Sequence, residues 1–171
     1  ADIASEPRWG RVMETFGEDP DLVTKMVTAQ DVAFQNGRDG LNTGAIVACM
    51  KHFPGAGPQM EGQDTSPIIS SAETPQILLK PYYAALEVNI ASIMPYYSVP
   101  LDLDMENSDI GSKATLQDLL RDEMGFEGII QPDRGMTSAI QEGRGKLTGA
   151  EGYDQEATQL YHTQRHADGI G

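Results

Sequence analysis

Basic residues, cysteines and long apolar stretches are all scarce in this chain, and each shortage excludes a class of protein. Lysine and arginine number 12 against 26 aspartates and glutamates, which gives a formal net charge of −14. Binding to nucleic acid requires a basic surface, so this acidity argues against a nucleic-acid partner. No apolar run is long enough to cross a bilayer, and we therefore expect no membrane-spanning segment.

The single cysteine, Cys49, rules out a disulfide within the chain. It lies in the apolar stretch 45–50, so we expect a small buried side chain there rather than a nucleophile. The chain does not open with a charged segment followed by an apolar one, and export can be neither inferred nor excluded. Its 171 residues are enough for one domain with a core.

Helix signals alternate with strand signals along the chain, which is the pattern of βαβ units. The predicted elements are helices over 20–35, about 72–89 and about 112–124, and strands over 45–50, 90–94 and 126–132. Asp19 and Pro20 are typical of a helix start, and Asn36-Gly37 of a helix end. Pro81 lies inside the second predicted helix, where we expect a kink or a break.

Polar side chains follow each of the three predicted strands. They are Lys51 and His52 after the first strand, Tyr96 and Tyr97 after the second, and Asp133 after the third. Because the carboxyl ends of parallel strands meet at one edge of a sheet or barrel, we expect these side chains to converge. This convergence is the main argument from the residues alone for an active site.

Each of these candidates has two interpretations. Asp133 suits a nucleophile, a general base or a metal ligand, but it is equally suited to cap the segment that follows. Lys51 and His52 are donors for a hydroxyl or a carboxylate, or else a surface lysine and a histidine bonded to backbone. A pair between Arg11 and Glu14 would hold a guanidinium in place for a ligand, or serve as a structural salt bridge.

Two further groups suggest metal binding only weakly. The acidic loop with Asp102, Asp104, Glu106 and Asp109 lacks the glycine of a calcium loop, which favours a solvated turn. His162 and His166 have helical spacing but no acid between them in the pattern of the metalloprotease helix. We therefore expect no metal site.

Four blocks of the sequence, taken together, resemble glycoside hydrolase family 3, which contains β-glucosidases, β-xylosidases and N-acetyl-β-glucosaminidases. The blocks are Pro7-Arg8-Trp9-Gly10-Arg11 with Glu14 and Phe16-Gly17-Glu18-Asp19-Pro20; Lys51-His52-Phe53-Pro54-Gly55; Ala91-Ser92-Ile93-Met94-Pro95; and Leu120-Arg121-Asp122-Glu123-Met124-Gly125-Phe126-Glu127-Gly128. They occur in the family's order, and the resemblance extends from residue 2 to about 140.

The resemblance implies an α/β fold, a (β/α)8 TIM-like barrel that is incomplete in this chain. It also implies retaining hydrolysis of terminal β-linked sugars, with Asp133 as the nucleophile that forms a glycosyl-enzyme. Arg11, Lys51 and His52 match residues that bind the sugar at the cleavage point, and Tyr97 matches a tyrosine that supports the nucleophile. The implied partner is a carbohydrate, no cofactor is needed, and a secreted or periplasmic location fits the family.

The resemblance also predicts a piece of a larger enzyme. We expect residues 1–142 to form part of the barrel domain and residues 143–171, whose pattern is weak, to continue it, with no second domain. A (β/α)8 barrel needs at least about 200 residues. The resemblance also implies that the first part of the family's barrel is absent from this sequence. Most family members take the general acid from a second domain, so we expect a second domain or chain to supply it.

The sequence departs from the family pattern beside the nucleophile. Pro132 and Arg134 stand where the family usually has serine and tryptophan, and loss of the tryptophan removes a stacking surface for the sugar. The loop after His52 also lacks the histidine of the glucosaminidase branch. Two other hypotheses stay open: a non-catalytic sugar-binding remnant of the barrel, and a metal-dependent hydrolase that uses Asp133, His52 and the acidic loop.

Overall fold

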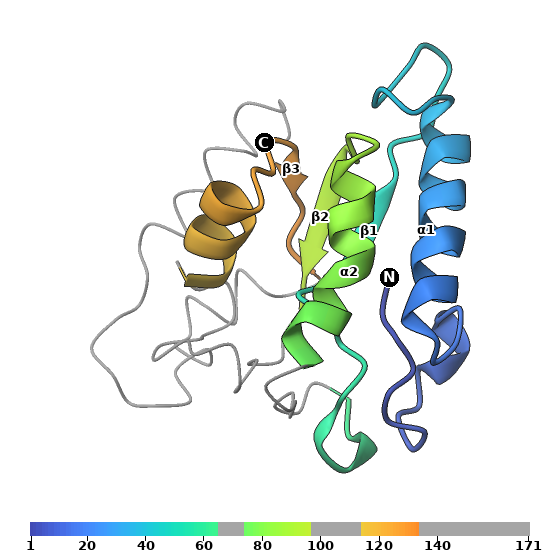
Figure 1. Ribbon diagram of the computed structural model, residues 1–171, viewed down its shortest axis with the longest axis vertical. Helices are drawn as coiled ribbons and strands as arrows, with labels where there is room; N and C mark the ends of the chain where they lie inside the picture. The colour runs from blue at the N-terminus through green and yellow to red at the C-terminus, as the bar shows by residue number, and fades with distance from the viewer. Residues whose placement is uncertain (65–73, 97–113, 134–171) are drawn as a thin grey trace.

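The computed structural model describes residues 1–64, 74–96 and 114–133 (Figure 1). Its elements are η1 (Val12–Glu14), α1 (Pro20–Gln35), β1 (Cys49–Phe53), η2 (Met60–Gly62), α2 (Thr74–Leu86), β2 (Ser92–Pro95), η3 (Ala114–Glu123) and β3 (Ile129–Ile130). The three strands form a parallel sheet in the order β1-β2-β3. The predicted α/β architecture with parallel strands is confirmed, and these strands form part of a barrel domain.

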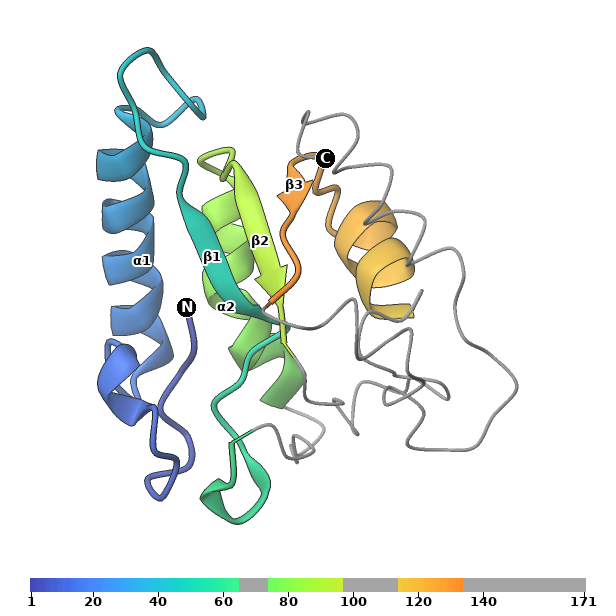
Figure 2. The same cartoon turned by 180° about the vertical axis from the view of Figure 1, so that it is seen from behind.

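One row of side chains across the sheet holds it against the helices. Met50 pairs with Ile93, Ile93 pairs with Ile130, and all three side chains are buried. Successive side chains of a strand point to opposite faces, so the next pair, Lys51 and Met94, points away from this core. Figures 1 and 2 show the two faces, with α2 covering β1 and β2 on one of them.

The start and end of α1 follow from local chemistry, as predicted. The Asp19 carboxylate caps the helix by accepting hydrogen bonds from the backbone amides of Asp21 and Leu22, at 2.8 and 3.2 Å. Pro20 occupies the first helical position, where the missing amide hydrogen costs no helical bond. Asn36 ends the helix in the left-handed conformation, with φ 58°.

The first strand lies later in the chain than predicted. The apolar stretch 45–50 predicted a strand there, but β1 begins at Cys49 and runs to Phe53. The amide of Ile46 donates to the Phe34 carbonyl at 2.8 Å, so the backbone there is bound to the end of α1 and not to β2. Lys51 and His52 consequently lie within the strand. Cys49 is half-buried, where we expected full burial, and burial raises the pKa of its thiol.

The remaining elements also differ from prediction at their ends. Of the kink or break predicted at Pro81, the break is wrong, because helix α2 continues through this residue. Strand β2 is displaced to 92–95, and β3 contains only Ile129 and Ile130. The helical segment η3 has wide turns, and the amide of Met124 that follows it bonds the Leu119 carbonyl, five residues back, at 2.9 Å. No described helix is long and apolar enough to cross a membrane.

The core lies between the sheet and the helices that pack on it. Its buried members are Ile3, Val23, Val27, Ala48, Met50, Phe53, Leu79, Tyr82, Ala85, Ile90, Ile93, Leu116, Leu119, Leu120, Phe126 and Ile130. Gln35, at the end of α1, is also fully buried; it donates to the Val88 carbonyl at 3.0 Å and accepts from the Ala91 amide at 2.8 Å. The core and this amide together connect α1 to the segment that leads into β2.

The buried side chain of Asp31 on α1 is the basis of a stability prediction. Its Oδ2 atom has no hydrogen-bond partner among the described residues, and burial raises the pKa of the carboxyl from 3.8 to about 6. Above pH 6 the folded state therefore bears the cost of a buried charge that the unfolded state does not. We expect Asp31→Asn to raise the thermal unfolding midpoint at pH 7.

The gain should shrink as the pH falls from 6 towards 3.8, because the wild-type carboxyl then becomes neutral in the folded state as well. Thermal unfolding followed by circular dichroism at pH 7 and pH 4 tests this expectation. Asp39→Asn is the matched control, since Asp39 is exposed and the substitution removes the same charge. Equal effects of the two substitutions would contradict the assignment to burial.

Candidate active site

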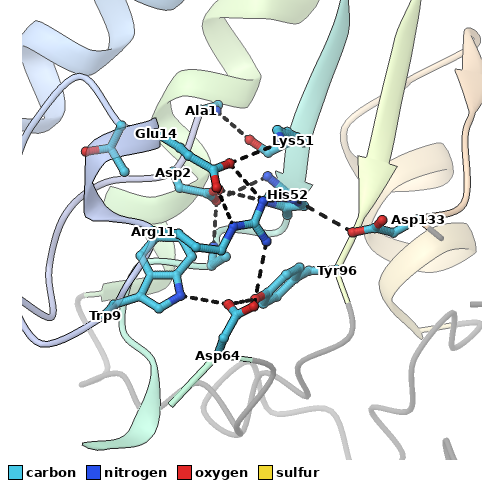
Figure 3. Close-up of polar contacts among 12 residues, drawn as sticks. Ala1, Asp2, Trp9, Arg11, Glu14, Lys51, His52, Asp64, Tyr96 and Asp133 are labelled. Atoms are coloured by element: carbon cyan, nitrogen blue, oxygen red, sulfur yellow. Dashed lines mark hydrogen bonds and ion pairs between the residues drawn. The ribbon is translucent and has the colours of Figure 1, made fainter. Parts of the chain in front are cut away.

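The carboxyl ends of the strands bring polar side chains from distant parts of the chain to one place (Figure 3). Strand β1 supplies Lys51 and His52, Tyr96 follows β2, and Asp133 follows β3. The loop and short helix η1 place Arg11 and Glu14 at the same edge. Of the predicted site residues, Arg11, Lys51, His52 and Asp133 therefore lie together, whereas Tyr97 lies outside the described residues.

His52 is at the centre of this group and is almost fully buried. Its Nδ1 atom lies 2.7 Å from Oδ2 of Asp2, and its Nε2 atom lies 3.2 Å from Nη2 of Arg11. The same Nε2 atom is 3.8 Å from Oδ2 of Asp133, a longer separation than a hydrogen bond. The imidazole therefore stands between a buried carboxylate on one side and the Arg11 and Asp133 groups on the other.

Asp2 holds the amino-terminal segment against the start of the loop after β1. Its Oδ1 atom accepts from the backbone amides of His52 and Ala56, at 3.1 and 2.8 Å. Burial is the largest influence on the pKa of Asp2 and would raise it, but the hydrogen bond from His52, the charge of the amino terminus and the backbone amide of Ala56 together lower this pKa below its ordinary value of 3.8. Gly57 allows the close approach, because a Cβ atom there would stand 1.8 Å from the carbonyl oxygen of Ile3.

Arg11 and Glu14 form the predicted pair, with two parallel hydrogen bonds of 2.8 Å from Nε and Nη2 to the two carboxylate oxygens. The Lys51 ammonium joins the pair at 3.3 Å from Oε2 of Glu14. The hydrogen bond from Arg11 lowers the pKa of Glu14 from 4.5 to about 2, with Lys51 adding to the effect. The bidentate geometry fixes the plane of the guanidinium and directs Nη2 at His52.

Asp64 connects the loop after β1 to three aromatic and basic side chains. Its Oδ1 atom accepts from the indole nitrogen of Trp9 at 2.8 Å and from the hydroxyl of Tyr96, and its Oδ2 atom lies 3.9 Å from Nη1 of Arg11. The guanidinium carbon stands 5.9 Å from the centre of the Trp9 ring and 6.0 Å from that of Tyr96. Tyr96 also packs against the His52 ring, at 4.7 Å between centres.

Sequence reasoning did not identify Asp2 or Asp64 as site residues. Asp2 is a lone carboxylate between Ala1 and Ile3, and a charge within an apolar segment is a signal for a buried pair. Tyr96 was expected among the converging side chains, although no role was assigned to it, and it lies in the site as expected. Asp64 had no local signal, because its partners lie 55 and 32 residues away in the chain. The acidic loop at 102–109, His162 and His166 lie outside the described residues.

Comparison with known proteins identifies the family. Residues 1–153 match the sequence model described as the glycosyl hydrolase family 3 N-terminal domain. The chain belongs to glycosyl hydrolase family 3. A periplasmic β-glucosidase/β-xylosidase of Dickeya chrysanthemi is 36% identical over 144 residues, which cover 78% of this chain and 22% of that protein. β-Glucosidase C of Emericella nidulans is 35% identical over 141 residues, 79% of this chain and 23% of that protein.

Solved structures of β-glucosidases contain the same fold. The β-glucosidase of Erythrobacter marinus superposes with a TM-score of 0.76 at 28% identity, covering 99% of this chain and 24% of that one. The β-glucosidase of Listeria innocua gives a TM-score of 0.75 at 29% identity, with coverage of 97% and 24%. This chain thus spans about a quarter of the length of these relatives.

The Arg11–Glu14 pair generates a prediction about pH. Because the pKa of Glu14 is about 2 in the folded state and 4.5 ordinarily, the stability that the pair contributes is complete above pH 4.5. It is lost as the pH falls through 2. We expect the Glu14 carboxyl to titrate near pH 2 in a carbon-13 NMR titration.

Glu14→Gln should destabilise the fold at pH 7 by no more than about 1 kcal/mol, since the pair is accessible to solvent. Glu18→Gln, at an exposed glutamate nearby, is the control for loss of the charge alone. A Glu14 carboxyl that titrates above pH 4 would show that the pair does not form.

Proposed function

We propose that this chain is part of the catalytic barrel of a retaining exo-β-glycosidase that hydrolyses terminal β-glucosides or β-xylosides, with Asp133 as the nucleophile. The observation that carries the proposal is the meeting of Asp133 with His52 and Arg11 at the carboxyl ends of β1 and β3, in a chain of family 3. We further propose that residues 1–142 form part of this barrel and residues 143–171 continue it.

The proposed reaction has two displacements at the anomeric carbon of the sugar. In the first, a carboxylate oxygen of Asp133 forms a bond to this carbon while the bond to the leaving oxygen breaks, and a general acid protonates that oxygen. In the second, the former general acid, now a base, takes a proton from a water molecule. The oxygen of this water bonds to the same carbon while the bond to Asp133 breaks, so that the β configuration is retained. Asp133 is suited to this task because its side chain is one-fifth exposed, at 19%, and therefore accessible to a sugar.

The donors around Asp133 suit a sugar, whose hydroxyl groups accept and donate hydrogen bonds. Arg11 keeps N–H groups directed into the site while Glu14 holds its plane. Lys51 is half-exposed beside it, and its ammonium can bond a ligand while it stays near Glu14. We propose that Arg11, Lys51 and His52 bind hydroxyls of the sugar at the cleavage point, and that Tyr97 supports the nucleophile.

The general acid is proposed to come from a second domain or chain. Retaining hydrolysis needs a second carboxyl group about 5–5.5 Å from the nucleophile. Asp2, Glu14 and Asp64 are the carboxyl groups of the polar cluster besides Asp133, and each accepts hydrogen bonds from side-chain donors of the protein. A carboxylate held as an acceptor in this way is poorly suited to donate a proton to a leaving group.

The substrate class follows the names of the relatives. The Dickeya protein is a β-glucosidase/β-xylosidase, and the Erythrobacter and Listeria proteins are β-glucosidases. One structure of the Listeria protein contains glucose and another contains isofagomine. These names support a small β-linked pyranoside as the substrate proposed for this chain.

The nucleophile is tested with dinitrophenyl β-glucoside and β-xyloside, whose leaving group needs little help from an acid. In the complete protein that contains this chain, we expect a burst of dinitrophenol and a covalent sugar adduct, seen as a mass increase of the intact protein. Asp133→Ala should abolish the adduct and lower turnover on the order of 10⁴-fold or more. Glu127→Ala, at an exposed carboxylate on the opposite end of β3, should leave both unchanged.

The same assay separates this proposal from a second candidate function, that of a non-catalytic sugar-binding barrel. The hydrogen bonds that Asp2, Glu14 and Asp64 accept favour this alternative, because they leave these carboxylates poorly suited to act as a general acid. That alternative predicts saturable binding of glucose or isofagomine with no release of dinitrophenol. An adduct that persists in Asp133→Ala would refute the assignment of the nucleophile, although not the family.

A further inference from the structure

Asp2 lies directly behind His52, on the side of the imidazole that faces away from Asp133 (Figure 3). Its side chain is only 8% exposed, and its two oxygens accept three hydrogen bonds. Two come from backbone amides and hold the segment in place, but the third comes from the imidazole itself. This third bond adds nothing to the backbone packing and therefore points to a role that concerns the ring.

The partners of the ring determine which nitrogen carries the proton. An ionised carboxylate can only accept a hydrogen bond, so Nδ1 of His52 must donate to Asp2 at 2.7 Å. A guanidinium can only donate, so Nε2 of His52 must accept from Arg11 at 3.2 Å. A doubly protonated ring would direct an N–H at the guanidinium nitrogen, where a cation would face a cation.

We propose that Asp2 is a positioning residue that holds His52 as the neutral Nδ1–H tautomer, so that Nε2 is a hydrogen-bond acceptor. Its single lone pair accepts from Arg11 in this structure and would accept from a hydroxyl of the sugar once that hydroxyl takes the place of the Arg11 N–H. Nε2 then selects for a sugar hydroxyl that donates a hydrogen bond. A fluorine or an ether oxygen at the same position of the sugar cannot donate one. The part that concerns the sugar rests on the proposed glycosidase function, whereas the tautomer follows from the contacts alone.

The position of the proton also matters for Asp133. If Nε2 carried a proton, it would face the Asp133 carboxylate across 3.8 Å and attract its negative charge. An anion stabilised in this way is a weaker nucleophile towards the anomeric carbon. By keeping the proton on Nδ1, Asp2 prevents His52 from competing with the sugar for Asp133. Asp2 itself does not touch the sugar in this arrangement and acts only through His52.

Asp2→Asn is the informative substitution. The amide oxygen of Asn can still accept from the backbone amides of His52 and Ala56, so the packing of the segment is retained. Its NH2 group, however, is a donor and faces Nδ1, which must then accept and transfer the ring proton to Nε2. The change therefore reverses the tautomer while it leaves the backbone contacts in place.

The tautomer is measured on the full chain, labelled with nitrogen-15, by NMR correlation of the ring nitrogens with the ring carbon-bound protons at pH 7. We expect wild-type His52 to show a protonated Nδ1 and an unprotonated Nε2, and Asp2→Asn to show the reverse. The matched control is Asp64→Asn, which alters a carboxylate of the same site that bonds Trp9 and Tyr96. It should leave the His52 pattern as in the wild type.

Slow hydrogen exchange of the Ala56 amide in Asp2→Asn verifies that the loop still packs on residue 2. A wild-type His52 that is doubly protonated, or protonated on Nε2, would overturn the proposal without any variant. An unchanged tautomer in Asp2→Asn, with the Ala56 amide still protected, would overturn it as well.

In the complete protein, Asp2→Asn should lower kcat/KM for dinitrophenyl β-glucoside roughly 10- to 100-fold, the effect of mismatching one buried hydrogen bond to a charged group. Absence of turnover in the wild type, combined with the expected tautomers, would contradict the glycosidase function and leave the role of Asp2 intact. Turnover that is equal in the wild type and Asp2→Asn would contradict the catalytic importance of the tautomer and leave the function intact.

Discussion

The parallel register of three short strands is the constraint on which the rest of the structure depends. Met50, Ile93 and Ile130 stand in one buried row, and this row fixes how far each strand extends towards the common edge. A shift of one residue in β1 would turn Met50 out of the core and bring Lys51 into it. The polar groups at the strand ends come together only because apolar side chains one to three residues earlier are packed.

The site that this register assembles is a series of hydrogen-bonded groups in which the neutral His52 separates the Asp2 carboxylate from the Arg11 guanidinium. Asp2 holds His52, His52 accepts from Arg11, and Glu14 holds Arg11 and Lys51. Each member fixes the orientation of the next, since hydrogen-bonded groups in a partly buried network restrict and polarise one another. Two groups of this arrangement are accessible to a ligand: the half-exposed ammonium of Lys51 and the partly exposed carboxylate of Asp133.

The proposed function assigns the two carboxyl groups of a retaining hydrolase to different parts of the protein. Asp133 belongs to the barrel, and its position is fixed by β3 and by the packing of Phe126 and Ile130 beneath it. The carboxylates around it act instead as acceptors that orient Arg11, His52 and Trp9. A nucleophile held by rigid strands and an acid brought by a second domain or chain would meet only around a bound sugar.

The sequence by itself determined the family, the parallel α/β class, the ends of α1 and the cluster of Arg11, Lys51, His52 and Asp133, because these depend on local signals. Asp19 and Pro20 act within the first turn of α1 and Asn36 within its last turn, and the residues of each family motif are neighbours in the chain. It did not place β1, since pairing with β2 and the bond between Ile46 and Phe34 are contacts over long distances. Nor did it reveal Asp2 or Asp64. The role of a buried carboxylate depends on its hydrogen-bond donors, and only tertiary packing brings these donors to it.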